Sequence, residues 1–287
     1  MTVLVVTRNE ELNIAFCLES VRGLADQIFV IDSESSDRTV DIARPLCDYV
    51  ERLPYDHSRI IPWIFQWSLD HLPIRNDWIL ILEADQVLTP ELREDICCLL
   101  CEGTPAHAGY YLRRLQYFRG KKIRYGGYGG KRLLKLFRRS KSQLDPKEQD
   151  TRVYVNGSCG QLRGILKEHN RKEDAILFYL EKHLRYADAF AAEENERRSG
   201  RLSWKTTPRF FGTPDQRILW LKSRYYQMPL YIRPFGYFFY RYVILLGFLD
   251  GKEGFVFHFL QAFWFRLVID IRLDELRRVE HAGNKRH

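Results

Sequence analysis

The stretch WILILEADQVLTPEL, residues 78–92, joins an apolar strand to two carboxylates and a helix start. Residues 78–82 are all apolar and suit a strand that is buried in a parallel sheet. The apolar run ends on Glu83 and Asp85, and Thr89-Pro90 marks the expected start of a helix. Two acidic residues at the end of a core strand point to a polar site where this strand leaves the sheet.

The chain before residue 100 alternates short apolar strands with helices. Strands are expected at 2–6, 27–32, 48–53 and 78–85, with helices at 11–24, 36–46 and 60–72 between them. This alternation predicts right-handed crossovers and a mostly parallel sheet flanked by helices. From residue 110 to 164, aromatic and basic strands broken by glycines predict an antiparallel addition to the sheet edge. We therefore predict an α/β domain over residues 1–172.

The rest of the chain, residues 173–287, is expected to be a helical, aromatic and basic region. Its apolar blocks, 234–249 and 254–271, fall short of the ~20 residues of a bilayer-spanning helix and contain Arg241, His258 and Arg266. Clustered aromatic and arginine side chains suit a surface lying in a lipid headgroup layer. The alternative is a helical subdomain packed on the first domain or on a second copy of the chain.

The composition is that of a folded protein with a moderate positive charge. The 287 residues are 45% apolar and 14% aromatic, and 45 Lys and Arg against 37 Asp and Glu give a net charge of +8. This charge favours an anionic partner, either a phosphate-bearing ligand or a lipid surface, although a plain solvated face would look the same. No feature points to nucleic acid.

Six cysteines are present, three of them in the stretch CCLLC at 97–101. Neither a second CxxC nor a nearby histidine pair completes a zinc site, so we expect small buried thiols. The chain enters a strand at once, with no basic leader or cleavage site, which favours a reducing, cytoplasmic location.

In open α/β sheets, ligands gather at the carboxyl ends of parallel strands. Asp32 ends the expected strand 27–32, and Glu83 and Asp85 end the strand 78–85, so all three are candidates to face one cleft. Carboxylates two residues apart can aim oxygen atoms at one divalent cation, and Mg²⁺ or Mn²⁺ keeps coordination positions for phosphate oxygens. Asp85 and Glu83 would then be the protein ligands of a metal ion, and the metal ion would bind the diphosphate.

Three segments also carry a family resemblance. VVTRNEELNIAFCLESV (5–21), VIDSESSDRTVDIA (30–43) and DWILILEADQVLTPEL (77–92) resemble the nucleotide-sugar-binding half of family 2 glycosyltransferases with the GT-A fold. The resemblance is to bacterial enzymes that decorate lipopolysaccharide cores, capsules and other surface glycans. It implies a GT-A-like, Rossmann-like domain with a C-terminal helical extension.

The resemblance also implies roles for individual residues. Asp32 and Ser33 would approach the nucleoside, and Glu83-Ala84-Asp85 would take the place of the family's DxD motif at the ribose and metal-diphosphate. The other donor-binding candidates are Thr7, Arg8, Asn9, Glu10, Gln66, Lys135, His169 and Arg171. Gln66 and Trp67 could pack under the nucleotide, although a tryptophan at helical spacing is more often part of the core. His169 could be structural, and Lys135 could lie solvated on an edge strand.

Catalysis in this family inverts the anomeric carbon by direct displacement, which needs a general base for the acceptor hydroxyl. Asp150 is the first candidate for the base and Glu148 the second, and either could be a solvated loop carboxylate. Many relatives read Asp-Ala-Asp-Glu where this chain has Glu83-Ala84-Asp85-Gln86, so one formal charge is lost. A catalytically degraded binding protein is therefore an alternative, and a nucleotidyltransferase is another.

The hypothesis that follows is a cytoplasmic glycosyltransferase, peripheral on the inner-membrane surface. It would take a sugar from a nucleotide-diphosphate donor, with UDP the first choice of nucleotide, in the presence of Mg²⁺ or Mn²⁺. The acceptor would be a surface glycan or a lipid-linked glycan. A homo-oligomer is possible, and no nucleic-acid partner is expected.

Overall fold

The computed structural model describes residues 1–56, 60–101 and 105–284 and divides the chain into two compact units. The first unit holds Met1–Gly120 and Gly130–Lys172, and the second holds Lys121–Gly129 and Glu173–His287. The segment Lys121–Gly129, which the sequence analysis assigned to the first domain, thus belongs to the second unit.

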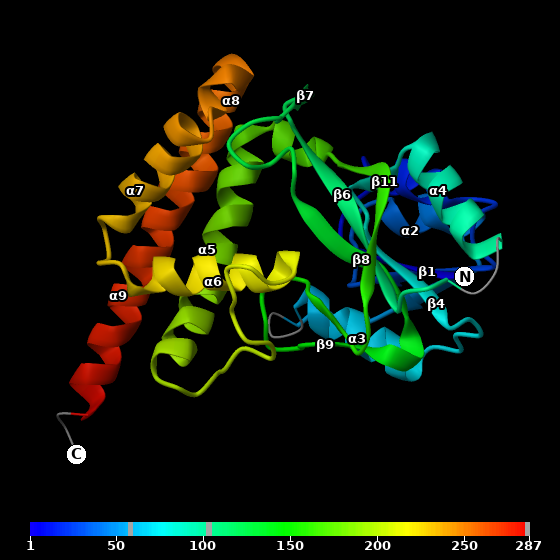
Figure 1. Cartoon of the computed structure of the whole chain (residues 1–287), viewed down its shortest axis with the longest axis horizontal. Coiled ribbons are helices and arrows are strands. Elements are labelled where there is room, and N and C mark those ends of the chain that lie inside the picture. Colours follow the sequence, from blue (N-terminus) through cyan, green and yellow to red (C-terminus); the bar gives the residue numbers. More distant parts are fainter. Residues whose placement is uncertain (57–59, 102–104, 285–287) are drawn as a thin grey trace. The chain divides into compact units, whose positions relative to one another are not determined.

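The first unit is built on a mixed sheet, whose strands β1, β4, β8, β6 and β11 are labelled in Figure 1. The strand order is β3-β2-β1-β4-β8-β6-β11-β5. Strands β3, β2, β1 and β4 run parallel, β8 is antiparallel to both of its neighbours, β11 is parallel to β6, and β5 is antiparallel to β11. The strands are β1 Thr2–Thr7, β2 Gln27–Asp32, β3 Tyr49–Arg52, β4 Trp78–Glu83, β5 Gln86–Leu88, β6 Gly109–Phe118, β8 Arg132–Arg138 and β11 Cys159–Glu168. A separate pair is formed by β9 Ser142–Leu144 and β10 Val153–Val155.

Alternate residues of each central strand enter two different cores, as the twofold repeat of a strand requires. Val3 and Val5 of β1 pack in one core with Ile14 and Leu18, and Leu4 and Val6 pack in the other with Ile64 and Phe65. Figure 1 shows the helix α3 (Ile61–His71) on one side of the sheet and α4 (Pro90–Cys101) on the other. The helices of this unit are α1 Ile14–Val21, α2 Thr39–Ala43, α3 Ile61–His71 and α4 Pro90–Cys101. The expected α/β class, with a mostly parallel sheet covered by helices, is confirmed.

Two sequence-based expectations about this unit are wrong. Strand β8 lies between β4 and β6, so the alternative that Lys135 is solvated on an edge strand fails, and Lys135 is only 1% exposed. Cys97, Cys98 and Cys101 were expected to be buried but are exposed, because α4 turns Leu92 and Ile96 towards the sheet instead.

The second unit is helical. It contains α5 Ile176–Arg198, α6 Pro214–Gln227, α7 Arg233–Phe239, η4 Tyr240–Ile244, η5 Gly247–Asp250, α8 Gly251–His258, η6 Phe259–Trp264 and α9 Phe265–Asn284 (Figure 1). Its core joins Ala187 and Ala191 of α5 to Phe265, Ile269 and Leu273 of α9.

A fully buried arginine holds the helices of this unit together. Arg233 of α7 donates to both carboxylate oxygens of Glu194 on α5, over 2.7 and 2.9 Å, and contacts Asp270 of α9 over 2.6 Å. All three side chains are at most 1% exposed. Buried charges of this kind persist only when they are paired and hydrogen-bonded, so the three helices depend on one another.

The segment Lys121–Gly129, which includes the short strand β7 Lys121–Lys122, is fixed to the helices of the second unit. The Asp250 carboxylate accepts hydrogen bonds from the backbone N–H groups of Arg124 and Tyr125 over 2.9 to 3.1 Å. Gly126 has a φ of +64°, and a Cβ at this position would lie 2.0 Å from the ring of His258. A glycine is therefore required where the segment meets the helices.

One helical segment of the second unit, Gly247–Glu280, is long and apolar enough to cross a membrane by length and composition alone. The most apolar window in its 34 residues has a mean hydropathy of 1.4, and 39% of that window is buried inside the protein. Core helices of soluble proteins meet the same criteria, so this segment is weak evidence for a membrane span.

Candidate functional site

The carboxyl ends of three neighbouring strands meet at one edge of the first unit's sheet. In the register of the sheet, Thr7 of β1 lies beside Asp32 of β2, and Val6 of β1 lies beside Glu83 of β4. The structure thus brings the predicted residues Thr7, Asp32 and Glu83 to one edge. The Thr7 Oγ1 atom is buried and has no hydrogen-bond partner among the residues that the structure describes, so a polar group is available at this edge.

The loop after β2 is folded around Asp32. This carboxylate is fully buried and accepts hydrogen bonds from the backbone N–H of Ser35, over 3.0 Å, and from its hydroxyl. The predicted residue Ser33 is also buried and donates its N–H to the carbonyl of Thr7. Asp32 therefore shapes the loop, and its carboxylate oxygens are engaged by Ser35.

The loop after β1 is tied to the loop after β2. Asn9 has a φ of +53° and donates its backbone N–H to Ser35 Oγ over 2.8 Å, while its side-chain oxygen accepts the Ser36 N–H over 2.7 Å. Asparagine tolerates this left-handed conformation better than most residues. Arg8, next in the loop, stacks on the ring of Tyr55 at 3.2 Å.

Glu10 connects these loops to the segment that follows β11. Its carboxylate accepts from Lys172 Nζ over 2.6 Å and from Asn13 Nδ2 over 2.7 Å, and Asn13 in turn donates to Asn170 over 3.2 Å. Arg171 donates its backbone N–H to Asn13 and places its guanidinium 3.8 Å from the ring of Phe16. The predicted residues Glu10 and Arg171 thus lie in one polar network.

Glu83 is held by an ion pair across the sheet. Its Oε1 accepts from Lys135 Nζ over 3.1 Å and from Gln86 Nε2 over 3.4 Å. The side chain of Lys135 is 2% exposed, whereas that of Glu83 is 31% exposed, so the carboxylate reaches the surface and the ammonium lies behind it. The ion pair lowers the negative charge that Glu83 can offer to a ligand.

The amide of Gln86 links Glu83 to a second carboxylate. Gln86 is fully buried, and its Nε2 donates to Glu168 Oε2 over 2.8 Å. The other oxygen of Glu168 accepts from Arg114 over 2.7 Å. Burial opposes the charge of Glu168, but Arg114, Gln86 and two neighbouring lysines outweigh it and lower the pKa of this carboxyl. Glu168 is therefore charged at neutral pH.

Asp85 lies in the turn between β4 and β5, beside this network. Its carbonyl accepts the backbone N–H of His169 over 3.0 Å, so the predicted residues Asp85 and His169 are neighbours. The ring of His169 lies 5.8 Å from that of Tyr117. The turn after β4 therefore lies against the segment that follows β11, although these two segments are more than eighty residues apart in sequence.

In the part of the chain that the structure describes, no group of three or more His, Cys, Asp and Glu side chains is arranged to hold a metal ion. Asp85 and Glu83 nevertheless fit a divalent cation that also binds diphosphate, because Mg²⁺ is commonly held by one or two carboxylates plus phosphate oxygens. The ion pair of Glu83 with Lys135 makes Asp85 the stronger candidate of the two.

Other predicted residues lie in different surroundings. Glu148 is 1% exposed, pairs with Arg152 and accepts from the hydroxyl of Tyr154 over 2.7 Å. Asp150 is half-buried in the loop between β9 and β10. Gln66 accepts the N–H of Leu144 over 2.8 Å and so links α3 to β9. The catalytic role of Asp150 or Glu148 stays a prediction, as does a nucleotide contact of Gln66.

Three residues of the network were missed from the sequence: Arg114, Asn13 and Asn170. Arg114 lies in β6 within a segment rich in aromatic and basic residues, and only the pairing of β6 with β11 brings it to Glu168. Asn13 and Asn170 are short polar residues near helix starts, where capping is the ordinary explanation. No local signal distinguishes these residues from their neighbours.

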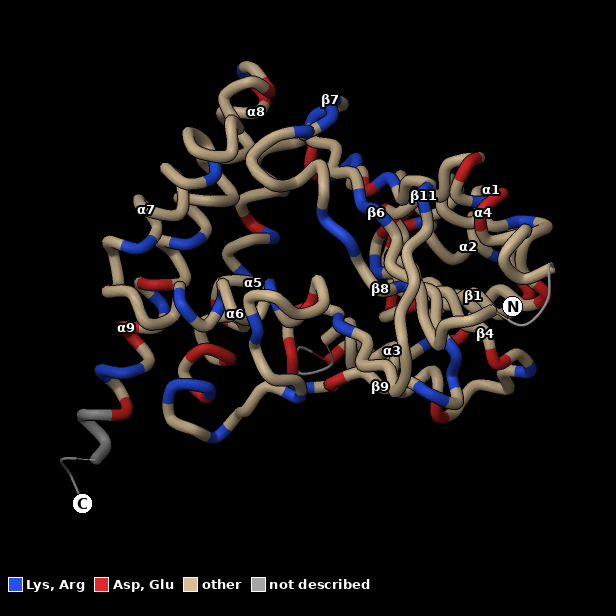
Figure 2. Tube along the Cα trace, in the orientation of Figure 1, with Lys and Arg blue, Asp and Glu red and all other residues tan. Residues whose placement is uncertain are grey.

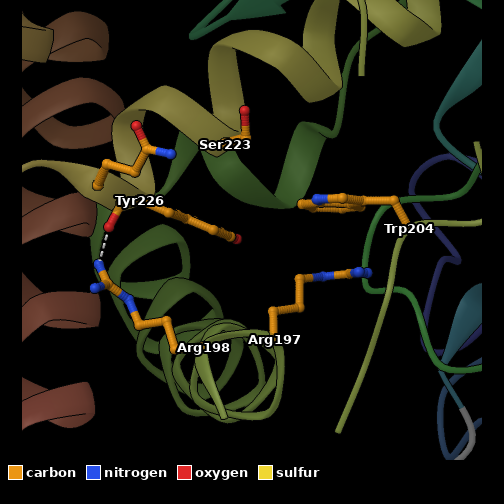
Figure 3. A pocket seen from close by; sticks show the side chains of 6 residues that line it. Arg197, Arg198, Trp204, Ser223 and Tyr226 are labelled. Carbon is orange, nitrogen blue, oxygen red and sulfur yellow. Dashed lines mark hydrogen bonds between the residues drawn. The ribbon is translucent and has the colours of Figure 1, made fainter. Parts of the chain in front are cut away.

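The second unit contains a separate pocket of about 230 Å³ (Figure 3). Arg197 and Arg198 of α5 lie on one side, with Tyr226 of α6 and Trp204 of the connecting loop on the other (Figure 3). The guanidinium of Arg197 lies 3.5 Å from the centre of the Trp204 ring. None of the residues predicted as donor-binding or catalytic lines this pocket.

Comparison with known proteins gives one family. Residues 2–63 match the model of glycosyl transferase family 2, and this range runs from β1 into α3. The family resemblance of the N-terminal segments is thereby confirmed for that part of the chain. The match covers Thr7, Arg8, Asn9, Glu10, Asp32 and Ser33 and ends before Glu83 and Asp85.

Curated relatives match over less than half of the chain. A glycosyltransferase of Rickettsia typhi, itself uncharacterized, is 31% identical over 121 residues, which are 42% of this chain and 40% of the relative. An uncharacterized glycosyltransferase of Rickettsia bellii is 35% identical over 96 residues, 33% of this chain and 31% of the relative. The chain thus spans less than half the length of these relatives.

The chain is also similar to solved structures, at lower sequence identity. Residues 1–349 of TarS from S. aureus are 12% identical, with 96% of this chain and 91% of that chain covered and a TM-score of 0.44. Glucosyl-3-phosphoglycerate synthase from Mycobacterium tuberculosis, solved with Mn²⁺ and UDP, is 21% identical over 40% of this chain and 43% of that chain, with a TM-score of 0.30.

Proposed function

We propose that this chain, whose residues 2–63 match the model of glycosyl transferase family 2, is a glycosyltransferase that uses a nucleotide-diphosphate sugar. The observation that carries the proposal is the register that sets Thr7 beside Asp32 and Val6 beside Glu83. It supports a single ligand-binding edge at the carboxyl ends of parallel strands, which is where open α/β sheets bind nucleotides.

The donor is proposed to lie along this edge. The loops of residues 7–10 and 32–37 would hold the nucleoside, and Glu83 and Asp85 would face the ribose and the diphosphate. Around the diphosphate, His169 and Arg171 would supply positive charge or hydrogen-bond donors. Lys135 is buried behind Glu83 and would act only through its ion pair with that carboxylate. We place UDP first among the nucleotides.

A divalent cation, Mg²⁺ or Mn²⁺, is part of the proposal. Asp85 would be its main protein ligand and Glu83 the second, with the diphosphate completing the coordination. When bound, such an ion stabilises the negative charge of a departing nucleoside diphosphate. The protein's own part is to hold Asp85 at a fixed place, through the bond from the His169 N–H to the Asp85 carbonyl.

The proposed reaction is a direct displacement with inversion. The oxygen of an acceptor hydroxyl attacks the anomeric carbon, the bond from that carbon to the diphosphate oxygen breaks, and a carboxylate takes the hydroxyl proton. Asp150 is the first candidate for this base. Glu148 is the weaker one, because Arg152 and Tyr154 already engage its carboxylate.

The acceptor is proposed to be a surface glycan or a lipid-linked glycan, reached at the cytoplasmic face of the inner membrane. The exposed aromatic side chains of the second unit motivate this location. A second candidate function, binding of nucleotide sugars without turnover, is motivated by Gln86, which stands where many relatives carry a third acidic residue. Binding alone would leave the donor intact.

Product analysis tests the proposal. The purified chain is incubated with UDP-sugars and Mn²⁺, with and without a membrane glycolipid extract as acceptor. Release of UDP that depends on the acceptor and is lost in Asp85→Asn, but kept in Asp41→Asn at an exposed position of α2, is the expected result. In a parallel incubation with UTP and a sugar 1-phosphate, release of pyrophosphate would point to a nucleotidyltransferase. Binding of the UDP-sugar without release of UDP would point to the second candidate.

A further inference from the structure

The outward surface from Tyr231 to Leu249 carries no exposed charge. Its exposed residues are all apolar, aromatic or glycine, because the charged residues of this segment turn inward. Arg233 is fully buried in its ion pairs, and Arg241 lies 4.3 Å from the centre of the Tyr128 ring. Asp250, directly after the segment, accepts the N–H groups of Arg124 and Tyr125.

The apolar side chains on this surface are large and open to solvent. Ile232 is 65% exposed, Phe235 is 60% exposed and Ile244 is 57% exposed, values found rarely for neighbouring residues of a soluble protein. Phe255 of α8 and Phe259 of η6 are also large, apolar and exposed. We call the exposed members of this set the apolar face: Tyr231, Ile232, Phe235, Phe239, Tyr240, Val243, Ile244, Leu246, Phe248, Leu249, Phe255 and Phe259.

Basic residues lie next to one end of the apolar face. Lys121, Lys122 and Arg124 lie in the segment that is bonded to Asp250 and Leu245, and Lys252 follows Asp250 directly in the chain. Figure 2 shows the Lys and Arg positions along β7. In this group Glu253 pairs with Lys121, and Asp250 is buried, so the exposed basic side chains remain in excess.

We propose that the apolar face docks on an anionic lipid bilayer, with its aromatic and aliphatic side chains in the headgroup layer and the basic residues on lipid phosphates. An apolar helical surface next to lysines and arginines is the combination that interfacial membrane proteins use. A second copy of this chain is a poorer partner, because it would bring the same excess of positive charge to the contact. The inference lies wholly in the second unit and does not depend on the proposed reaction.

The bonded segment gives the face a defined shape. Gly126 donates its N–H to the Leu245 carbonyl over 2.8 Å, and Leu246 has a φ of +59°, so the chain turns sharply between η4 and η5. This turn fixes the directions of η4 and η5, and with them the positions of their exposed apolar side chains. Because these side chains are already exposed in the folded protein, polar substitutions there should leave folding intact.

The test is sedimentation of the full chain with vesicles of phosphatidylcholine, alone or mixed with phosphatidylglycerol. The pair Phe235→Ser and Ile244→Ser removes two members of the apolar face. The matched control pair is Leu177→Ser and Phe211→Ser, which are 76% and 95% exposed in the same unit but outside the face. A third pair, Lys122→Gln and Lys252→Gln, removes two of the basic residues.

The wild-type chain should bind mixed vesicles about tenfold or more tightly than phosphatidylcholine alone. The apolar pair should weaken binding about tenfold or more, the control pair should not, and the lysine pair should remove the preference for phosphatidylglycerol. Absence of wild-type binding, or binding by the apolar pair equal to wild type, would overturn the inference. A dimer in solution that the apolar pair abolishes would assign the face to a second copy and overturn it too.

Discussion

Gln86 donates a hydrogen bond from Nε2 to Glu168 Oε2 over 2.8 Å, and its own Oε1 accepts the backbone N–H of Glu83 over 3.2 Å. One buried amide thus donates to the carboxylate of Glu168 and accepts from the backbone at the end of β4. An acidic residue at this position would place a third carboxylate beside Glu168 and Glu83. The surroundings of residue 86 therefore favour a neutral amide that can both donate and accept a hydrogen bond. The difference between Gln86 and the Glu of many relatives thus has a structural role besides the change in charge.

Gln86→Glu should destabilise the protein, and more so at higher pH. The new carboxyl would be buried beside two others, so its folded pKa would be raised above its unfolded value of about 4.3. A carboxyl whose pKa is raised by folding destabilises the folded state as pH rises, because the unfolded chain releases the proton more easily. The free energy of unfolding of Gln86→Glu should therefore be about 2 kcal/mol or more below that of the wild type at pH 8, and the difference should shrink towards pH 5. Urea unfolding at both pH values measures it.

The control for that substitution is Gln161→Glu, which adds a carboxylate at an exposed position of β11. Equal stability of Gln86→Glu and Gln161→Glu at pH 8 would mean that the hydrogen bonds of Gln86 contribute nothing.

Lys135→Met should destabilise the fold by about 1–3 kcal/mol. The substitution keeps the volume of the buried side chain but leaves Glu83 without its ammonium partner, and Glu83 is partly exposed, so the cost falls below that of a fully buried pair. Chemical denaturation against Lys167→Met, a substitution at an exposed position on β11, measures the difference. No difference between the two variants would show that the ion pair does not stabilise the fold.

Asp150→Asn should lower kcat by about a hundredfold or more while donor affinity is kept, as loss of a general base does. Steady-state rates and donor binding, measured on the same preparation, separate the two effects. A rate near that of the wild type would remove Asp150 from the reaction.

Glu148→Gln is the companion variant, and we expect it to act on stability. Glu148 is buried with Arg152, so loss of its charge leaves a buried guanidinium without its partner. Thermal unfolding should show a lower Tm with kcat changed little in the fraction that remains folded. A large fall in kcat at unchanged Tm would instead make Glu148 the base.

His258 should make stability depend on pH. Burial, reinforced by Arg241, lowers the pKa of His258 to about 4, although the Asp250 carboxylate lies 4.0 Å away. Its unfolded pKa is about 6.5, so between these values the unfolded chain binds a proton that the folded chain excludes. Stability should therefore fall as pH drops from about 6.5 to 4, by about 2–3 kcal/mol.

Urea unfolding between pH 7 and pH 4 checks the His258 prediction. His258→Leu should flatten this part of the profile, whereas His71→Leu, at an exposed position of α3, should not. An unchanged profile in His258→Leu would assign the acid sensitivity to other groups.

The sequence predicted the parallel part of the fold well because that part is encoded locally. The runs 28–31 and 78–82 are continuous and apolar, and the segments between them have helical patterns. The parallel strands, and the edge where their carboxyl ends meet, could therefore be inferred. Asp32 and Glu83 were placed correctly at the strand ends for this reason. The order of the later strands could not be inferred, because nothing local indicates that β8 lies between β4 and β6.

The polar network of the site was less predictable because it depends on distant contacts. Glu168 and Gln86 are 82 residues apart and meet only through the pairing of β11 with β5. Arg114 joins them from β6, and no spacing rule relates these three positions. The exposure of Cys97 and Cys98 was not predicted, because apolar and polar residues are mixed along α4 and the sequence does not show which side of this helix packs on the sheet.

The most direct test of the central claim is the thermal stability of the chain with UDP, GDP, CDP and dTDP, each with and without Mn²⁺. The account predicts that one diphosphate raises Tm only when Mn²⁺ is present, with about 2.7 kcal/mol of added stability at a hundredfold excess over Kd. It also predicts that Asp85→Asn loses this response while Asp41→Asn keeps it. No response to any diphosphate from a well-folded chain, or an equal response in Asp85→Asn, would contradict it.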